Sequence, residues 1–208
     1  MCSVSADDAL KRLMEGNQRY VNGESHFPRI CPQTRVETAK EQRPFAVILG
    51  CSDSRVPAEI VFDQGIGDLF VIRTAGHRID SLAIASVEYA VSQLDVRLVI
   101  VLGHQRCGAI SAALDWHQSP EAWKMDESPV GINHMPQLLE KLRDVVDRTR
   151  TLPGDHLDNA VRENIFTVIR RLKESSSVLQ ESMYLDKLKI VGAYYSLDKG
   201  TIQVLKSD

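Results

Sequence analysis

The sequence predicts an α/β protein with a central, mainly parallel β-sheet that has an antiparallel edge strand, is flanked by helices and carries an N-terminal helical arm. Two observations lead to this prediction. Short, largely apolar runs occur at 45–49, 69–72, 97–103 and 188–195, and none of them alternates apolar with polar residues. Such strands are buried on both faces, as in a parallel sheet covered by helices. Segments with helical periodicity separate the runs, which is typical of α/β folds.

Length and composition limit the possible classes of protein. The chain has 208 residues, 43% of them hydrophobic, so we expect one domain over residues 1–208 with a helical arm over about 1–44. A net charge of -3 gives no electrostatic reason to expect nucleic acid or an anionic membrane as a partner. No run approaches the ~20 apolar residues of a membrane span, and the first residues lack the apolar stretch of a signal peptide. We therefore expect a cytoplasmic protein.

The first helix has clear end signals. Ser5 can cap it, Asp8 takes its third position, and Gly23 can end it. The segment 24–44 contains three prolines, so no continuous element is expected there.

The remaining elements follow from periodicity. Apolar residues recur at helical spacing in 80–95, which predicts a crossover helix between the second and third strands. The stretches 135–149 and 157–182 each read as an amphipathic helix. Residues 201–205 follow a turn and are expected to pair in antiparallel fashion with the strand at 188–195.

Two predicted strands end in polar clusters. Cys51, Asp53 and Arg55 follow the first, in "FAVILGCSDSR", and His104 and Cys107 follow the third, in "RLVIVLGHQRCGA". If these strands are neighbours, both clusters face the crevice where strand order reverses, which is where ligands bind in open α/β sheets. Thiolates and an imidazole suit zinc and argue against magnesium or calcium.

Other interpretations of these cysteines stay open at this point. A cysteine at the end of a strand is usually a small buried side chain. Cys51 could also be the nucleophile of a hydrolase with His104 as its base, although this leaves Cys107 without a role. The four cysteines, which include Cys2 and Cys31, are widely spaced in a chain of this size, so we expect reduced thiols and no disulfide framework.

The two clusters resemble the signatures of the β-class carbonic anhydrases. The first signature, CxDSR, stands at 51–55, and the second, HxxC followed by glycine, stands at 104–108. The stretches "PAEIVFDQGIGDLFVIRTAGH" (57–77) and "IVGAYYSLDKG" (190–200) also resemble the middle and the final strands of that family. The resemblance covers most of the chain and is weakest from about 115 to 160.

The resemblance implies an enzyme that reversibly hydrates carbon dioxide to bicarbonate and a proton. It implies zinc on Cys51, His104 and Cys107, with water or, in a closed state, Asp53 as the fourth ligand. In the open state zinc-bound hydroxide attacks carbon dioxide, and Asp53 with Arg55 orients the hydroxide. A surface ion pair is the plainer interpretation of these two residues.

Further expectations concern substrate and assembly. Gln33 and Gly108 are candidate substrate contacts, although Gln33 also reads as a polar loop residue, and His77 could relay protons at the rim of the site or be a loop histidine. The family forms dimers that often pair into tetramers, and an N-terminal helix with little sheet of its own to cover could pack on a partner. Two alternatives remain: hydrolysis of carbon disulfide or carbonyl sulfide on the same scaffold, and a non-catalytic zinc protein with a closed site.

Overall fold

A computed structural model describes residues 4–119 and 134–205, which include one five-stranded sheet. Its strands are β1 (Ala46–Cys51), β2 (Leu69–Thr74), β3 (Leu98–His104), β4 (Lys189–Tyr195) and β5 (Ile202–Leu205). They lie in the order β2-β1-β3-β4-β5, and only β4 and β5 pair in antiparallel fashion. The predicted fold class is confirmed. Because β2 lies outside β1 while β3 lies on its other side, strand order reverses between β1 and β3.

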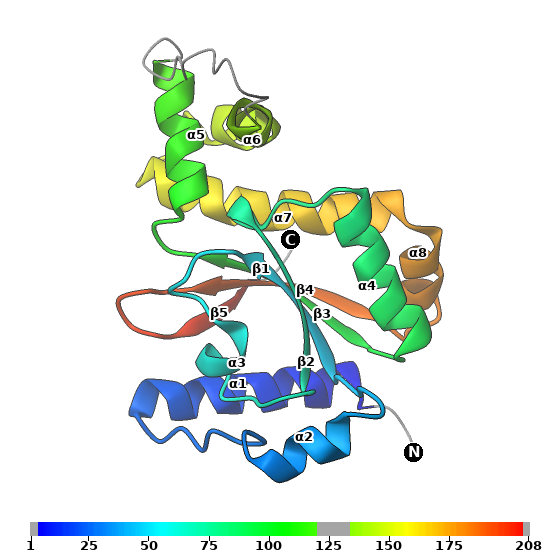
Figure 1. The fold of residues 1–208 in the computed structure, drawn as a ribbon. Coiled ribbons are helices and arrows are strands. Elements are labelled where there is room, and N and C mark those ends of the chain that lie inside the picture. The colour runs from blue at the N-terminus through cyan, green and yellow to red at the C-terminus, as the bar shows by residue number, and fades with distance from the viewer. Residues whose placement is uncertain (1–3, 120–133, 206–208) are drawn as a thin grey trace, which may run out of the picture.

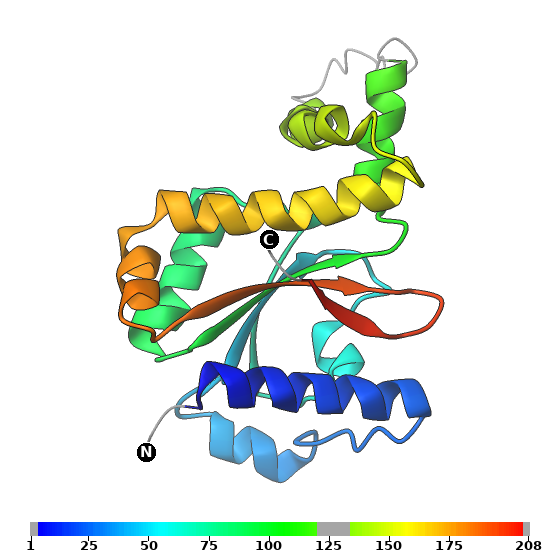
Figure 2. The ribbon, with the colours of Figure 1, turned by 180° about the vertical axis from the view of Figure 1, so that it is seen from behind.

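Helices cover both faces of the sheet (Figure 1). One face carries α1 (Ala6–Asn22), α2 (Pro32–Thr38) and α3 (Ala58–Val61), and the other carries α4 (Ser81–Gln93), α7 (His156–Ser175) and α8 (Ser177–Tyr184). The helices α5 (Gly108–Gln118) and α6 (Met135–Thr149) lie together beyond the sheet, and a short 3-10 turn, η1 (Ala75–His77), follows β2. Seen from behind, α7 and α1 run along opposite sides of the sheet (Figure 2). No helix in the described ranges has the length and apolar character needed to cross a bilayer.

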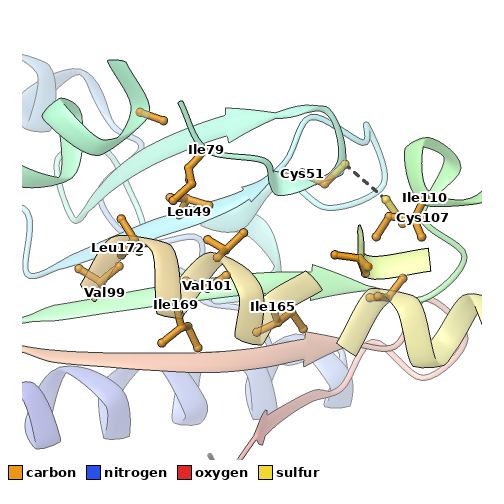
Figure 3. Close-up of a cluster of buried hydrophobic side chains, with 14 of the residues drawn as sticks. Leu49, Cys51, Ile79, Val99, Val101, Cys107, Ile110, Ile165, Ile169 and Leu172 are labelled. Carbon is orange, nitrogen blue, oxygen red and sulfur yellow. Dashed lines mark hydrogen bonds between the residues drawn. The ribbon is translucent and has the colours of Figure 1, made fainter. Parts of the chain in front are cut away.

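The two central strands are buried along their whole length. In β1, Val47 and Leu49 belong to the core cluster that packs against α7 (Figure 3), whereas Ala46 and Ile48 belong to the cluster that includes α1. Successive side chains of a strand point to opposite faces, so a strand covered on both faces needs apolar residues at every position. This is the reason for the continuous apolar runs in the sequence.

The ends of α1 are those expected from the sequence. The side chain of Ser5 accepts a hydrogen bond from the backbone N–H of Asp8 at 3.1 Å. Gly23 ends the helix with a φ of 72° and a ψ of 20°, a left-handed conformation that glycine adopts without steric cost.

The expectation that α1 has little sheet of its own to cover is wrong. Leu13 is completely buried in the core cluster of its own sheet. Asn17, also buried, donates from Nδ2 to the carbonyls of Val61 and Gly200 at 2.9 and 2.8 Å, and its Oδ1 accepts from the N–H of Ile202 at 2.9 Å. These bonds fix α1 to both α3 and β5 of the same chain.

Three details of secondary structure differ from the expectations. The segment 24–44 does contain a helix, α2, which tolerates Pro32 because its first helical position needs no N–H. The predicted helix over 157–182 is interrupted at Ser176, which has extended backbone angles and caps α8 by accepting from the N–H of Leu179 at 3.2 Å. Helix α5, directly after the second signature, was not expected from periodicity.

The helix α7 approaches the sheet closely because glycines of β3 and β4 face it. A Cβ on Gly103 would lie 2.6 Å from Cδ1 of Ile165, and one on Gly192 would lie 2.8 Å from Cγ2 of the same residue. Both distances are shorter than van der Waals contact, so glycine at these positions leaves the room that Ile165 occupies.

Candidate metal centre

Three potential ligands meet at the point where strand order reverses. Cys51 ends β1, His104 ends β3, and Cys107 precedes the first residue of α5. Their ligand atoms all lie within 4.8 Å of one another, and the two sulfur atoms are 3.9 Å apart. All three side chains are buried. The expected meeting of the two clusters beyond the ends of neighbouring strands is therefore confirmed.

The ring of His104 is oriented as a metal ligand requires. Its Nδ1 lies 3.0 Å from the carbonyl oxygen of Gln105, so Nδ1–H donates there and Nε2 keeps its lone pair. Within the described residues, this buried Nε2 has no hydrogen-bond partner. A buried polar atom without a partner costs about 1–3 kcal/mol. A metal ion on Nε2 would satisfy this atom, and metal-bound histidines usually hold their other nitrogen in this way.

The two buried thiols share a proton. The S–H of Cys107 donates to the sulfur of Cys51, which lowers the pKa of Cys51 and raises the pKa of Cys107. A bound cation would displace the remaining proton, since metals bind the thiolate form. Among the described cysteines, Cys31 is also free but is exposed. Two sulfurs and one imidazole form a donor set that fits zinc.

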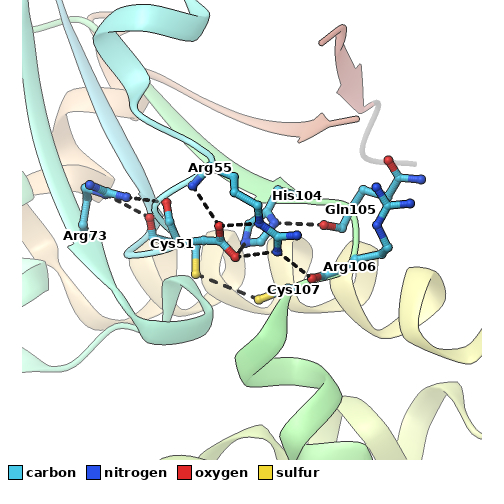
Figure 4. A network of polar contacts seen from close by, with 8 residues as sticks. Cys51, Arg55, Arg73, His104, Gln105, Arg106 and Cys107 are labelled. Carbon is cyan, nitrogen blue, oxygen red and sulfur yellow. Dashed lines mark hydrogen bonds and ion pairs between the residues drawn. The ribbon is translucent and has the colours of Figure 1, made fainter. Parts of the chain in front are cut away.

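Asp53 lies beside these ligands but is held by Arg55, which itself lies near Cys51, His104 and Cys107 (Figure 4). Arg55 donates from Nε to Oδ1 at 2.9 Å and from Nη2 to Oδ2 at 2.8 Å, and its backbone N–H donates to Oδ1 at 3.0 Å. These hydrogen bonds lower the pKa of Asp53 to about 2, so the carboxylate is ionised at neutral pH. Its Oδ2 is 3.8 Å from Nε2 of His104. The carboxylate is thus adjacent to the ligands while bound to the guanidinium.

The loop between His104 and Cys107 is tied to the β4–β5 turn. Asp198 accepts from both terminal nitrogens of Arg106, at 3.1 and 2.5 Å, and from Nε2 of Gln105 at 2.9 Å. The carbonyl oxygen of Arg106 in turn accepts from Nη2 of Arg55 at 3.2 Å. Asp198 therefore supports the loop that orients both His104 and Arg55, a role that nothing in the local sequence indicates.

The turn η1 borders the site on its other side. His77 is completely buried there, so of its two interpretations the one that placed it at the rim of the site is wrong. Burial lowers the pKa of His77 to about 3. Its Nε2 lies 2.8 Å from Nδ2 of Asn164 on α7. Asn164 was missed in the sequence, although an asparagine on the apolar face of a predicted helix, between Val161 and Val168, is a detectable signal.

The two candidate substrate contacts lie in different places. Gly108 is the first residue of α5 and is exposed, and a Cβ built on it would meet no atom within 4 Å. Open space therefore adjoins Gly108, the residue after Cys107. Gln33 lies on α2, is exposed and donates to Oε1 of Glu37 at 3.3 Å. No hydrogen bond or ion pair found in the described part of the chain joins Gln33 to the three ligands.

The fold and the cluster define an α/β protein with a candidate metal-ligand set at the switch point of its sheet. Known proteins are similar to it in sequence and in fold. The family model described as carbonic anhydrase matches residues 46–202. Carbonic anhydrase 2 of Mycobacterium tuberculosis is 40% identical over 192 residues, covering 92% of this chain and 89% of that protein. The chain belongs to the carbonic anhydrase family and is an enzyme of that kind.

Solved structures share the fold. The β-carbonic anhydrase CcaA matches with a TM-score of 0.70 and 27% identity, covering 95% of each chain. One of two structures described as tetrameric β-carbonic anhydrases, from Sordaria macrospora, matches with a TM-score of 0.70 and 21% identity, covering 96% of this chain and 98% of the other.

Proposed function

We propose that the protein catalyses the reversible hydration of carbon dioxide to bicarbonate and a proton, with zinc bound by Cys51, His104 and Cys107. The observation that carries this proposal is the convergence of these three buried ligand atoms within 4.8 Å, beside a carboxylate held by an arginine. When bound, zinc would lower the pKa of a coordinated water and so supply a nucleophile near neutral pH.

Asp53 and Arg55 would keep the site open. A carboxylate bound on both oxygens by Arg55 is restrained from moving onto the adjacent ligand set, which would leave a fourth position free for water. As an ionised acceptor, Asp53 can also orient the reacting water by a hydrogen bond. This arrangement argues against the non-catalytic alternative with a permanently closed site. No contact in the described residues favours a sulfur analogue of carbon dioxide.

Gly108 is proposed as the substrate contact within this chain. The open space beside it adjoins the N-terminus of α5, where the helix dipole and free N–H groups favour an anion such as bicarbonate. Gln33 remains a proposed bicarbonate contact. Because no hydrogen bond found among the described residues joins it to the candidate ligands of its own chain, we propose that it acts toward the site of a second copy.

We propose that residues 1–208 form one domain that assembles as a homodimer or homotetramer. Large apolar side chains are exposed around a groove of about 380 Å³ near the edge strand β2: Phe27 (60% exposed), Ile30, Ile60 and Ile66. Exposed apolar patches of this kind support association. Mass measurement in solution tests the proposal, and a monomer at micromolar concentration would contradict it.

Two cysteine variants test the function. Cys107→Ser should lose zinc and carbon dioxide hydration together, whereas Cys31→Ser should retain both because Cys31 is exposed and outside the ligand cluster. Metal analysis and stopped-flow hydration are the measurements. A Cys107→Ser protein with a full complement of zinc would contradict the ligand assignment, and zinc without turnover in the unmodified protein would favour the closed-site alternative.

A further inference from the structure

The turn after β2 has an unfavourable backbone conformation next to the site. Gly76 has a φ of 63° and His77 a φ of 43°, so two successive residues are left-handed. Glycine adopts this conformation freely, but histidine does so at a cost, and the surrounding structure must hold it. The turn lies against the end of β1, where the N–H of Ser52 donates to the carbonyl of Thr74 at 3.1 Å.

The turn also touches the metal-ligand set. The backbone amide of Gly76 faces the sulfur of Cys51 and favours its thiolate form. A Cβ on Gly76 would lie 3.3 Å from Cβ of Ala109, two residues after Cys107. A shift of the turn would therefore change the surroundings of both sulfur ligands.

Asn164 holds this turn from the opposite side. Its Nδ2 donates to the carbonyl oxygen of Gly76 at 2.8 Å and to Nε2 of His77 at 2.8 Å. Its Oδ1 accepts from Nη1 of Arg78 at 3.4 Å. Asn164 and His77 are completely buried, so water cannot readily replace these bonds. A single amide thus binds three consecutive residues of the turn.

The position of Asn164 is fixed independently of the turn. Its neighbour Ile165 packs into the space above Gly103 and Gly192, which sets the distance of α7 from the sheet. The helix therefore presents Asn164 as a fixed donor. A donor on a fixed helix can hold the turn in its strained conformation, whereas a donor that moved with the turn would not prevent its relaxation.

We propose that Asn164 is a positioning residue for the metal centre: it clamps the 76–78 turn so that the amide of Gly76 stays directed at the sulfur of Cys51. The inference rests on the proposed function of Cys51 as a metal ligand. Without the amide of Asn164, the Gly76 carbonyl and the His77 ring lose their partners and the left-handed turn is free to relax. The amide of Gly76 would then turn away from the sulfur of Cys51, and the strength with which that sulfur donates to a metal would change.

The test compares Asn164→Ala with Asn17→Ala. Both asparagines are buried, and each donates two hydrogen bonds and accepts one, but Asn17 joins α1 to α3 and β5 and does not contact η1. Thermal unfolding of both variants should shift downward by similar amounts. Only Asn164→Ala should weaken zinc binding in a chelator competition, by about tenfold. It alone should also shift the thiolate-to-metal absorption band of the cobalt(II)-substituted protein.

Each outcome is decisive. Equal zinc affinities and equal cobalt spectra in the two variants would overturn the inference while leaving the proposed function intact. An unmodified protein that binds no metal would overturn the proposed function itself. If Asn164→Ala does not fold, ¹⁵N NMR of the unmodified zinc protein decides: the clamp requires the proton of His77 on Nδ1, and a proton on Nε2 would overturn it.

Discussion

Arg55→Ala removes both side-chain bonds that hold the carboxylate of Asp53, at 2.9 and 2.8 Å, together with the bond to the carbonyl of Arg106. A hydrogen bond to a charged group contributes about 1.5–3 kcal/mol, but an exposed ion pair contributes only about 0–1 kcal/mol. The Arg55 side chain is 50% exposed, so we take about 1–2 kcal/mol for the bidentate pair. About 1.4 kcal/mol corresponds to a factor of ten in an equilibrium constant. The pair with Arg55 therefore shifts the equilibrium between the held and the freed carboxylate by about 5- to 30-fold.

The freed carboxylate has a short distance to travel. Oδ2 of Asp53 already lies 3.8 Å from Nε2 of His104, so it can reach the ligand set and compete for the fourth position. We therefore expect Arg55→Ala to keep its zinc and to lose about 5- to 30-fold in kcat/KM for carbon dioxide hydration. Metal analysis and stopped-flow measurement of the same preparation check both parts.

Arg97→Ala is the matched control. Arg97 pairs at 3.5 Å with Asp95, two positions earlier, which is the spacing of Arg55 and Asp53. It directly precedes β3 and so lies at the end of that strand opposite to His104. Its loss should leave kcat/KM unchanged. The reasoning would be refuted by an Arg55→Ala enzyme that retains both zinc and near-normal turnover, or by an equal loss of activity in Arg97→Ala.

Three further predictions follow from the packing and the charges. Gly103→Ala should lower the free energy of unfolding by about 1–3 kcal/mol, and Ile165→Val should recover part of this loss by removing Cδ1; strictly additive effects in denaturant titrations would contradict the steric explanation. His77 has a folded-state pKa of about 3 and an unfolded value near 6.5, so the unfolded state binds more protons in this window. Stability should therefore fall as pH drops below about 6.5, by at most about 1.4 kcal/mol per pH unit, and His77→Asn should flatten this slope in unfolding curves recorded from pH 7 to 4. Asp198→Ala should lower kcat/KM by at most about fivefold, because its ion pair is exposed and acts through the loop; a loss larger than that of Arg55→Ala would contradict this order.

The central sheet could be predicted because its signal is local. β1 and β3 are covered on both faces, so burial requires apolar residues at every position. Such strands can be recognised without knowing which residues of neighbouring strands pair. The break at Ser176 could not be predicted in the same way, since serine is compatible with a helix and only its cap of α8 reveals its role. Helix α2 was hidden by prolines that suit a first helical position as well as a loop.

The convergence of the candidate ligands could be predicted for a similar reason. Cys51 and His104 end adjacent parallel strands, so the sheet brings them together whatever the rest of the chain does. The supporting residues come from elsewhere: Asn164 from α7 and Asp198 from the β4–β5 turn. Their positions depend on how closely α7 packs against the sheet and on the path of the β4–β5 hairpin. Neither can be predicted from the residues near Cys51, His104 and Cys107.

The groups that orient the site are mostly backbone groups, and this limits what any motif can reveal. The carbonyl of Gln105 orients His104, the carbonyl of Arg106 accepts from Arg55, and the amide of Gly76 faces the sulfur of Cys51. Nearly every residue has the same backbone N–H and C=O groups, so a sequence motif does not identify the ones that orient the site. The direction of such a group depends on the local φ and ψ. Arg106 and Gly76 both have positive φ, at 51° and 63°, and are held there by contacts with distant elements. Substitutions at the supporting positions should therefore act on the candidate metal centre by relaxing these backbone angles, with every candidate ligand side chain still present.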